Sequence, residues 1–124
     1  MRVYILLIIG MLTVSCYQPE RVCSDFRTGT FEFSYIIEGK ETTDMFIRND
    51  SIEIAYTNST TDTSSIRWVN DCEFIVKKLY PTSLSEQKAV HIKIIATTKD
   101  SYTFEYAIVG DTKNKQRGVA KKID

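Results

Sequence analysis

Apolar and polar residues alternate along most of the chain, and this period of two is typical of β-strands that bury one face. The clearest run begins at Phe31 and ends before the turn signal Gly39-Lys40. No stretch has apolar residues spaced three and four apart over the roughly ten positions that a helix needs. The pattern therefore predicts an all-β protein.

Seven clear runs and one weak run follow one another, and the segments between them are short enough for neighbouring strands to be antiparallel. Eight such strands suit an up-and-down meander that closes into a small barrel, with a two-layer β-sandwich as the alternative. The short connections favour the barrel, because a Greek key needs a longer crossover. The runs are 31–37, 45–47, 52–56, 66–68, 72–76, 90–96, 102–108 and, more weakly, 117–123.

The turns between runs predict which side chains face the interior. A three-residue turn at 39–41 would set Tyr35 opposite Met45. A two-residue turn at Asn49-Asp50 would set Ile47 opposite Ile52. The aliphatic side of these runs then points inward. The inward residues expected on this basis are Met45, Ile47, Ile52, Ile54, Tyr56 and, on the last run, Val119.

Residues 64–76 contain the only tryptophan, Trp68, and form the central hairpin of the predicted fold. A three-residue loop at 69–71 would pair Trp68 with Cys72, whereas a two-residue loop would set Trp68 against a glutamate. The three-residue loop is favoured. It would place Asp71 in the left-handed region, which Asp and Asn tolerate better than other non-glycine residues.

Two polar segments interrupt the alternation. Residues 57–65 contain no apolar side chain and predict a loop, unless the flanking strands extend into it. Residues 77–88 form the longest interruption, and Pro81 excludes a continuous central strand there. One helical turn fits within this second segment.

The predicted interior is rich in aromatic residues. Eight strands enclose a space that side chains can fill or that can hold one small ligand. The bulk of the aromatic side chains favours an interior filled by side chains. Tyrosine hydroxyls need hydrogen-bond partners, however, and a ligand or water at the mouth of the barrel could supply them. The expected interior or ligand-facing residues are Phe31, Phe33, Tyr35, Tyr56, Trp68, Phe74, Tyr102, Phe104 and Tyr106.

The first fifteen residues have the features of a secretion signal. Arg2 follows the initiator methionine, and an apolar stretch of about ten residues, 3–12, precedes small residues and Cys16. Such a stretch is too short to span a bilayer. Cys16 after Ser15 resembles a bacterial lipobox, although Thr13 stands where that motif usually has leucine. This resemblance implies a mature chain anchored in a membrane by lipid on Cys16; ordinary signal cleavage is the alternative.

Export also bears on the two remaining cysteines, Cys23 and Cys72. An even pair in an oxidising compartment predicts a disulfide. The alternative is that Cys72 is a small buried apolar residue and Cys23 a flexible one. Residues 16–27 lack any period and read as a tether, which leaves residues 28–124 as a single β domain.

Charge and motifs exclude several classes of function. Acidic and basic residues balance over the whole chain, and removal of residues 1–15 takes away one arginine and leaves a net charge of −1. A protein of this charge lacks the basic face that nucleic-acid binding requires. His91 is the only histidine and lies on the expected outer face, so no metal site, cofactor or catalytic base is predicted.

Paired carboxylates are the remaining route to catalysis. Glu53 with Glu73, and Glu32 with Glu105, have the residue types of a glycosidase pair. All four stand in the outward register between apolar residues, where acids serve as solubilising charges. We therefore expect no catalytic residues and no enzymatic activity.

Several short segments together resemble a family of short exported bacterial lipoproteins. Members of that family are often labelled DNA topoisomerase IV. The length, near-neutral charge and export signal of this chain argue against such an activity. A weaker likeness to lipocalins rests on Gly29-Thr30-Phe31 and implies that a late arginine, Arg117, covers Phe31. The family segments are 16–21, 26–31, 66–68, 71–74 and 102–104.

These observations lead to one expected function and two alternatives. The leading expectation is a non-enzymatic lipoprotein of the bacterial cell envelope, in the outer membrane facing the periplasm or the cell surface, that binds a small apolar ligand in its barrel. The first alternative is a structural module that binds another envelope protein. The second, of low weight, is the topoisomerase-related role that the family label suggests.

Overall fold

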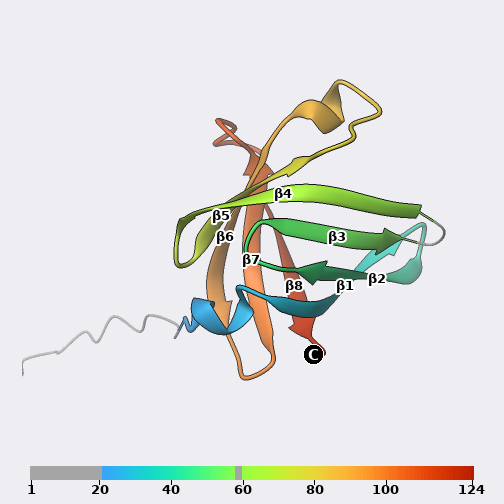
Figure 1. Ribbon diagram of the computed structural model, residues 1–124. Coiled ribbons are helices and arrows are strands. Elements are labelled where there is room, and N and C mark those ends of the chain that lie inside the picture. Colours follow the sequence, from blue (N-terminus) through green and yellow to red (C-terminus); the bar gives the residue numbers. More distant parts are fainter. Residues whose placement is uncertain (1–20, 58–59) are drawn as a thin grey trace, which may run out of the picture.

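The computed structural model describes residues 21–57 and 60–124, and it consists of eight antiparallel strands that close into a barrel (Figure 1). Each strand pairs with the next along the chain, and β8 pairs with β1. The predicted up-and-down barrel is therefore confirmed. The strands are β1 (Gly29–Ile37), β2 (Lys40–Arg48), β3 (Ile52–Thr57), β4 (Thr60–Asn70), β5 (Glu73–Lys78), β6 (Val90–Thr97), β7 (Ser101–Ile108) and β8 (Gln116–Lys122).

Helical structure within the described part is limited to two short 3-10 turns, η1 (Cys23–Phe26) and η2 (Ser85–Gln87). The second is the single helical turn expected between β5 and β6. Neither is long enough to cross a membrane. The expected signal peptide and the lipid-bearing Cys16 lie outside the described residues.

The polar segment 57–65 is not a nine-residue loop. β3 extends to Thr57, and β4 begins at Thr60. The whole of β3 pairs with the first half of β4. Threonine is β-branched and suits a strand, so hydroxyl-rich sequence continues the ladder without apolar residues. The longer connection expected around Pro81 is present between β5 and β6.

The first hairpin has a tighter turn than predicted. Ile37 pairs with Lys40, and the two-residue loop between them has positive φ at both Glu38 (50°) and Gly39 (77°). This is the geometry of a type I′ turn, whose twist matches that of the flanking strands. Tyr35 is consequently opposite Thr42 and not Met45.

The second hairpin also differs in register. Ile47 pairs with Ile54, and the Asn49 side chain accepts hydrogen bonds from the backbone N–H groups of Ser51 and Ile52. An asparagine at the start of a loop stabilises a turn in this way, so Asp50 and Ser51 become the loop residues. The register is shifted by two residues from the prediction, which leaves the relation between the faces of β2 and β3 unchanged.

The shorter first turn shifts the register of β2 against β1 by an odd number of residues, and such a shift moves every side chain to the opposite face of the sheet. The inward and outward faces of both β2 and β3 are therefore exchanged relative to the prediction. The residues expected inside β2 and β3 therefore lie on the outer surface: Met45, Ile47, Ile52, Ile54 and Tyr56. On β8, Val119 also points outward and is 54% exposed, whereas its neighbour Ala120 is buried.

The central hairpin differs from prediction as well. Trp68 pairs with Phe74, not Cys72, and a bulge at Val69 precedes a two-residue turn formed by Asp71 and Cys72. The Asn70 side chain accepts a hydrogen bond from the Cys72 N–H, which stabilises this turn without a left-handed residue. Asp71 does not have the positive φ that we expected.

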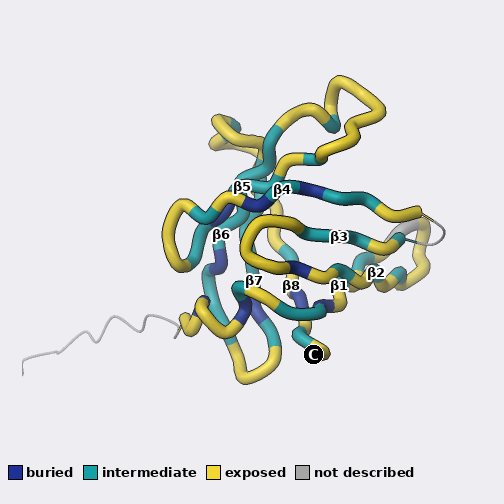
Figure 2. Tube along the Cα trace, viewed as in Figure 1, coloured by how far each residue is buried: buried dark blue, intermediate teal, exposed yellow. Residues whose placement is uncertain are grey.

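One end of the barrel is closed by η1, the blue turn at the lower left of Figure 1, where buried residues gather in Figure 2. The predicted disulfide between Cys23 and Cys72 joins η1 to the central hairpin. Phe26 inserts into the barrel and is 1% exposed. The folded unit thus begins before residue 28, since η1 belongs to its core. The buried cluster at this end comprises Cys23, Phe26, Phe31, Ile94, Tyr102 and Ala120.

We expect the disulfide to contribute substantially to stability, because it closes a loop with a sequence separation of 49. Replacing both Cys23 and Cys72 by serine should lower the free energy of unfolding by about 4 kcal/mol in the chain-entropy model. Urea denaturation of the variant and of the oxidised and reduced wild type measures this. An unchanged midpoint on reduction would show that η1 packing alone holds the closed end.

Candidate functional site

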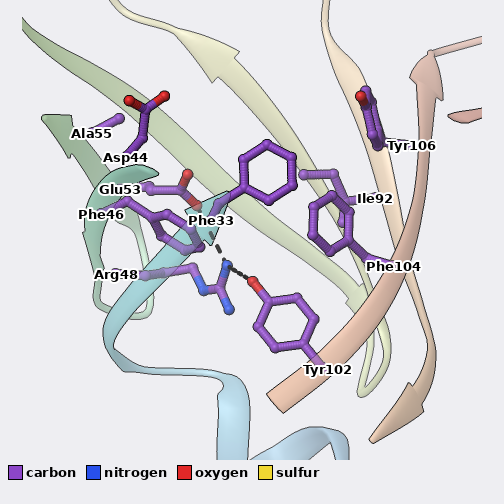
Figure 3. A pocket seen from close by; sticks show the side chains of 10 residues that line it. All are labelled: Phe33, Asp44, Phe46, Arg48, Glu53, Ala55, Ile92, Tyr102, Phe104 and Tyr106. Carbon is purple, nitrogen blue, oxygen red and sulfur yellow. Dashed lines mark hydrogen bonds and ion pairs between the residues drawn. The ribbon is translucent and has the colours of Figure 1, made fainter. Parts of the chain in front are cut away.

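A cavity of about 280 Å³ lies within the barrel, above the packed closed end. Its walls come from strands β1, β2, β3, β6 and β7. Figure 3 shows the side chains arranged around it, with Arg48 and Tyr102 at one end and Tyr106 far from them. The lining residues are Phe33, Asp44, Phe46, Arg48, Glu53, Ala55, Ile92, Tyr102, Phe104 and Tyr106.

Arg48 is the central polar residue of the interior and is 2% exposed. Its Nη1 donates to the Tyr102 hydroxyl (3.2 Å) and to the Glu53 carboxylate (3.4 Å). Its Nη2 donates to the Phe26 carbonyl at 2.5 Å, and its Nε to the Arg27 carbonyl at 3.3 Å. Four of the five guanidinium N–H groups therefore have protein acceptors.

Aromatic rings surround the same guanidinium. Its carbon lies 4.6 Å from the centre of the Phe31 ring and 4.8 Å from that of Phe74. Cations in such positions are attracted by the negative face of the ring. The lipocalin likeness predicted that Arg117 covers Phe31, and this is wrong: Arg117 is on the outer surface with Glu105, and Arg48 covers Phe31.

Glu53 reaches the cavity from β3, directly across the ladder from Arg48. The prediction of an outward, solubilising Glu53 is corrected by the reversed register. Burial raises the pKa of its carboxyl above the ordinary value, and the nearby Arg48 charge opposes this effect without cancelling it. Burial likewise raises the pKa of the Tyr102 phenol.

Asp44 is the second acid on the same wall, one strand away on β2. Its hydrogen bond and its negative charge raise the pKa of the Tyr35 phenol. The cavity lining thus contains two carboxyl groups and one guanidinium. With both acids ionised, its formal net charge is −1.

An aromatic and aliphatic wall faces the acids. In Figure 3, Phe104 and Ile92 lie on the far side of the cavity from Asp44 and Glu53, and Phe33 lies between. The Phe33 and Phe104 rings pack 5.6 Å apart. They approach Gly118 so closely that a Cβ atom there would come within 2.7 Å of both rings. Only glycine at this position leaves room for the two rings where they lie.

The structure brings together eight of the nine aromatic residues expected inside. Tyr56 is the exception: it points outward, opposite Met45, and is 39% exposed. The alternation did not predict that Arg48, Glu53 and Asp44 face the interior, because charged residues between apolar ones are expected on the outer face of a sheet. The signal that could have found them is Glu38-Gly39, since a two-residue turn there places all three inside.

The other candidate groups lie outside the cavity. His91 is on the outer surface, 3.8 Å from Glu73. Glu105 forms ion pairs there with Lys115 and Arg117. The described residues contain no group of three or more His, Cys, Asp and Glu side chains that could hold a metal ion.

Comparisons of the chain with protein-family models, with curated proteins and with solved structures find no match.

Arg48 and Glu53 should differ sharply in their contribution to stability. Arg48→Met leaves two carbonyls, a phenol and a buried carboxylate without their donor, so we expect a loss of about 3 to 5 kcal/mol in the free energy of unfolding. Glu53→Gln keeps an acceptor beside the guanidinium but removes its countercharge, while it also removes the cost of burying the carboxylate, so we expect a smaller loss of about 1 to 2 kcal/mol. Chemical denaturation measures both.

The exposed Arg117→Met serves as the control and should change stability by less than about 1 kcal/mol. Equal losses for Arg48→Met and Glu53→Gln would contradict this interpretation, since they would make the ion pair itself the dominant interaction.

Glu53 should also give the protein a characteristic pH dependence. Its pKa in the folded state is raised above the ordinary 4.5, so the folded state holds this proton more tightly than the unfolded chain does. The free energy of unfolding of the wild type, relative to Glu53→Gln, should therefore fall as pH rises from 4.5 through the raised pKa. Denaturation series between roughly pH 4 and pH 7 test this; a rise over the same interval would contradict it.

Proposed function

We propose that this protein is an exported, lipid-anchored component of the bacterial cell envelope that binds a small, largely apolar molecule inside its barrel and does not convert it. The observation that carries the proposal is the cavity beside the cluster of Phe33, Phe104 and Ile92. A filled barrel would have no such space, and an aromatic wall favours an apolar occupant.

The size of the cavity limits the ligand. Sites for drug-sized molecules typically have volumes of about 300 to 1,000 Å³, and this cavity of about 280 Å³ lies at the lower limit. A single ring with a short substituent suits it. A long acyl chain or a fused-ring sterol exceeds it.

The location is supported by two independent features. The sequence begins with an apolar stretch that leads to Cys16. The domain carries the Cys23–Cys72 disulfide, and disulfides persist in oxidising compartments such as the bacterial periplasm.

Binding without turnover is supported by the state of the polar groups. The Arg48 guanidinium is held by four protein acceptors, and Glu53 is paired to it. The only histidine lies on the outer surface. The described residues that line the cavity include no Ser, Thr, Cys, His or Lys that could act as a nucleophile or base with these groups. The polar end of the cavity is thus arranged for recognition.

A protein-interaction module is the second candidate, and one observation favours it. The outer face of β2 and β3 carries cross-strand apolar pairs, Ile47 with Ile54 and Met45 with Tyr56. Exposed apolar patches on soluble domains often mark interaction surfaces. The cavity remains the stronger case, because it combines enclosure, shape and polar groups in one place.

Filling the cavity should abolish ligand binding. Ala55 lines it from β3, and Ala55→Leu adds a branched side chain in the space that a ligand would occupy. Thr61→Leu adds the same side chain on the outer face, opposite Tyr56. Calorimetric titration with 2-phenylethanol should give heat of binding for the wild type and Thr61→Leu and none for Ala55→Leu.

Equal binding by the wild type and Ala55→Leu would place the ligand elsewhere on the molecule. Circular dichroism of Ala55→Leu provides the check that the barrel is intact.

A further inference from the structure

The cavity has a chemical asymmetry that indicates what kind of small molecule it selects. We infer that the ligand is an organic cation, with an ammonium group placed toward Asp44 and Glu53 and an apolar group placed against Phe33 and Phe104. This inference rests on the proposed function and names the ligand class of the same cavity.

The first argument is the charge of the wall. Asp44 and Glu53 both line the cavity, from neighbouring strands. Arg48 neutralises only Glu53. Asp44 takes part in none of the ion pairs formed by the described residues, and its contact is with the neutral Tyr35 phenol. One carboxylate therefore lines the cavity without a countercharge.

The second argument is that Arg48 is poorly available to an anionic ligand. Its side chain is 1% exposed, and its donors are directed to Glu53, Tyr102 and the η1 carbonyls. A ligand carboxylate would have to displace Glu53 from the guanidinium. It would then lie beside two like charges in a partly buried site, which is unfavourable.

The third argument is the opposite wall. Aromatic rings supply a large apolar surface, which suits the hydrocarbon part of such a ligand. Phe33, Phe104 and Tyr106 form a continuous series with ring centres 5.6 Å apart. Figure 3 shows Phe104 and Tyr106 across the cavity from the acids, with Phe33 between them, so one small molecule can contact both walls.

The rim of the cavity, near Tyr106, also favours a ligand that donates hydrogen bonds. The Tyr106 hydroxyl donates to the Gln116 side chain at 2.9 Å, so its hydrogen is not free to bind a ligand. This rim donor is thus engaged within the protein, whereas the Asp44 carboxylate lines the cavity as an acceptor. Ammonium groups are pure donors and match such an acceptor.

Three probes of matched shape test the inference on the purified full chain: 2-phenylethylammonium, 2-phenylethanol and phenylacetate. Calorimetric titration at neutral pH should give Kd values for the cation about tenfold lower than for the alcohol, with phenylacetate binding most weakly. Asp44→Asn should weaken cation binding by about fivefold and leave alcohol binding unchanged, which corresponds to the loss of one partly exposed charge pair.

Asp50→Asn is the matched control. It removes the same charge from an exposed loop residue that pairs with Arg27, outside the cavity, so it reports any effect of net charge alone. Both substitutions preserve side-chain size and a hydrogen-bond acceptor, so the variants should fold as the wild type does.

The outcomes separate the two proposals. Equal affinity for cation and alcohol, unaffected by Asp44→Asn, would overturn cation selection and leave the apolar cavity intact. Tightest binding of phenylacetate would overturn it too and would assign Arg48 to the ligand. Failure of all three probes to bind the wild type would overturn the proposed function itself. Cation preference that is lost in Asp44→Asn and retained in Asp50→Asn supports the inference.

Discussion

The buried guanidinium of Arg48 is the interaction on which the arrangement of this barrel depends. A charged group away from water is costly unless hydrogen bonds and a countercharge replace its hydration. Here the replacements are four acceptors from three parts of the chain: the carbonyls of Phe26 and Arg27, the Glu53 carboxylate and the Tyr102 hydroxyl. Arg48 therefore joins the η1 end, the β2–β3 hairpin and β7.

This arrangement divides the interior into two regions of different character. Below Arg48, Phe26 and Phe31 pack with Tyr102 into a closed core held by the disulfide. Above it, the strands enclose a cavity in which burial disfavours the ionised form of Glu53, as the raised pKa of its carboxyl indicates. Proteins retain such unfavourable groups most often at functional sites. The cavity side of Arg48 is therefore the candidate functional site.

Much of the fold was predictable from alternation alone. The number of strands and the aromatic side of β1 and β7 follow from a period of two, and the order of the strands follows from the short connections. The disulfide was predicted from the expected export and from the pair of cysteines left after Cys16. The site was not predictable in this way, since Arg48 and Glu53 are polar residues in strands whose other face is aliphatic. Burial in β2 and β3 depends on the register that the Glu38-Gly39 turn sets against β1, and alternation alone does not contain that register.

A single local cause links the missed site to the apolar outer surface. The two-residue Glu38-Gly39 turn sets the register of β2 against β1. It directs Asp44, Phe46 and Arg48 into the barrel and leaves Met45 and Ile47 outside. With a turn one residue longer, the aliphatic residues would fill the cavity, and Arg48 could not reach the η1 carbonyls. The same turn thus exposes the aliphatic side of this hairpin and directs its polar side into the cavity.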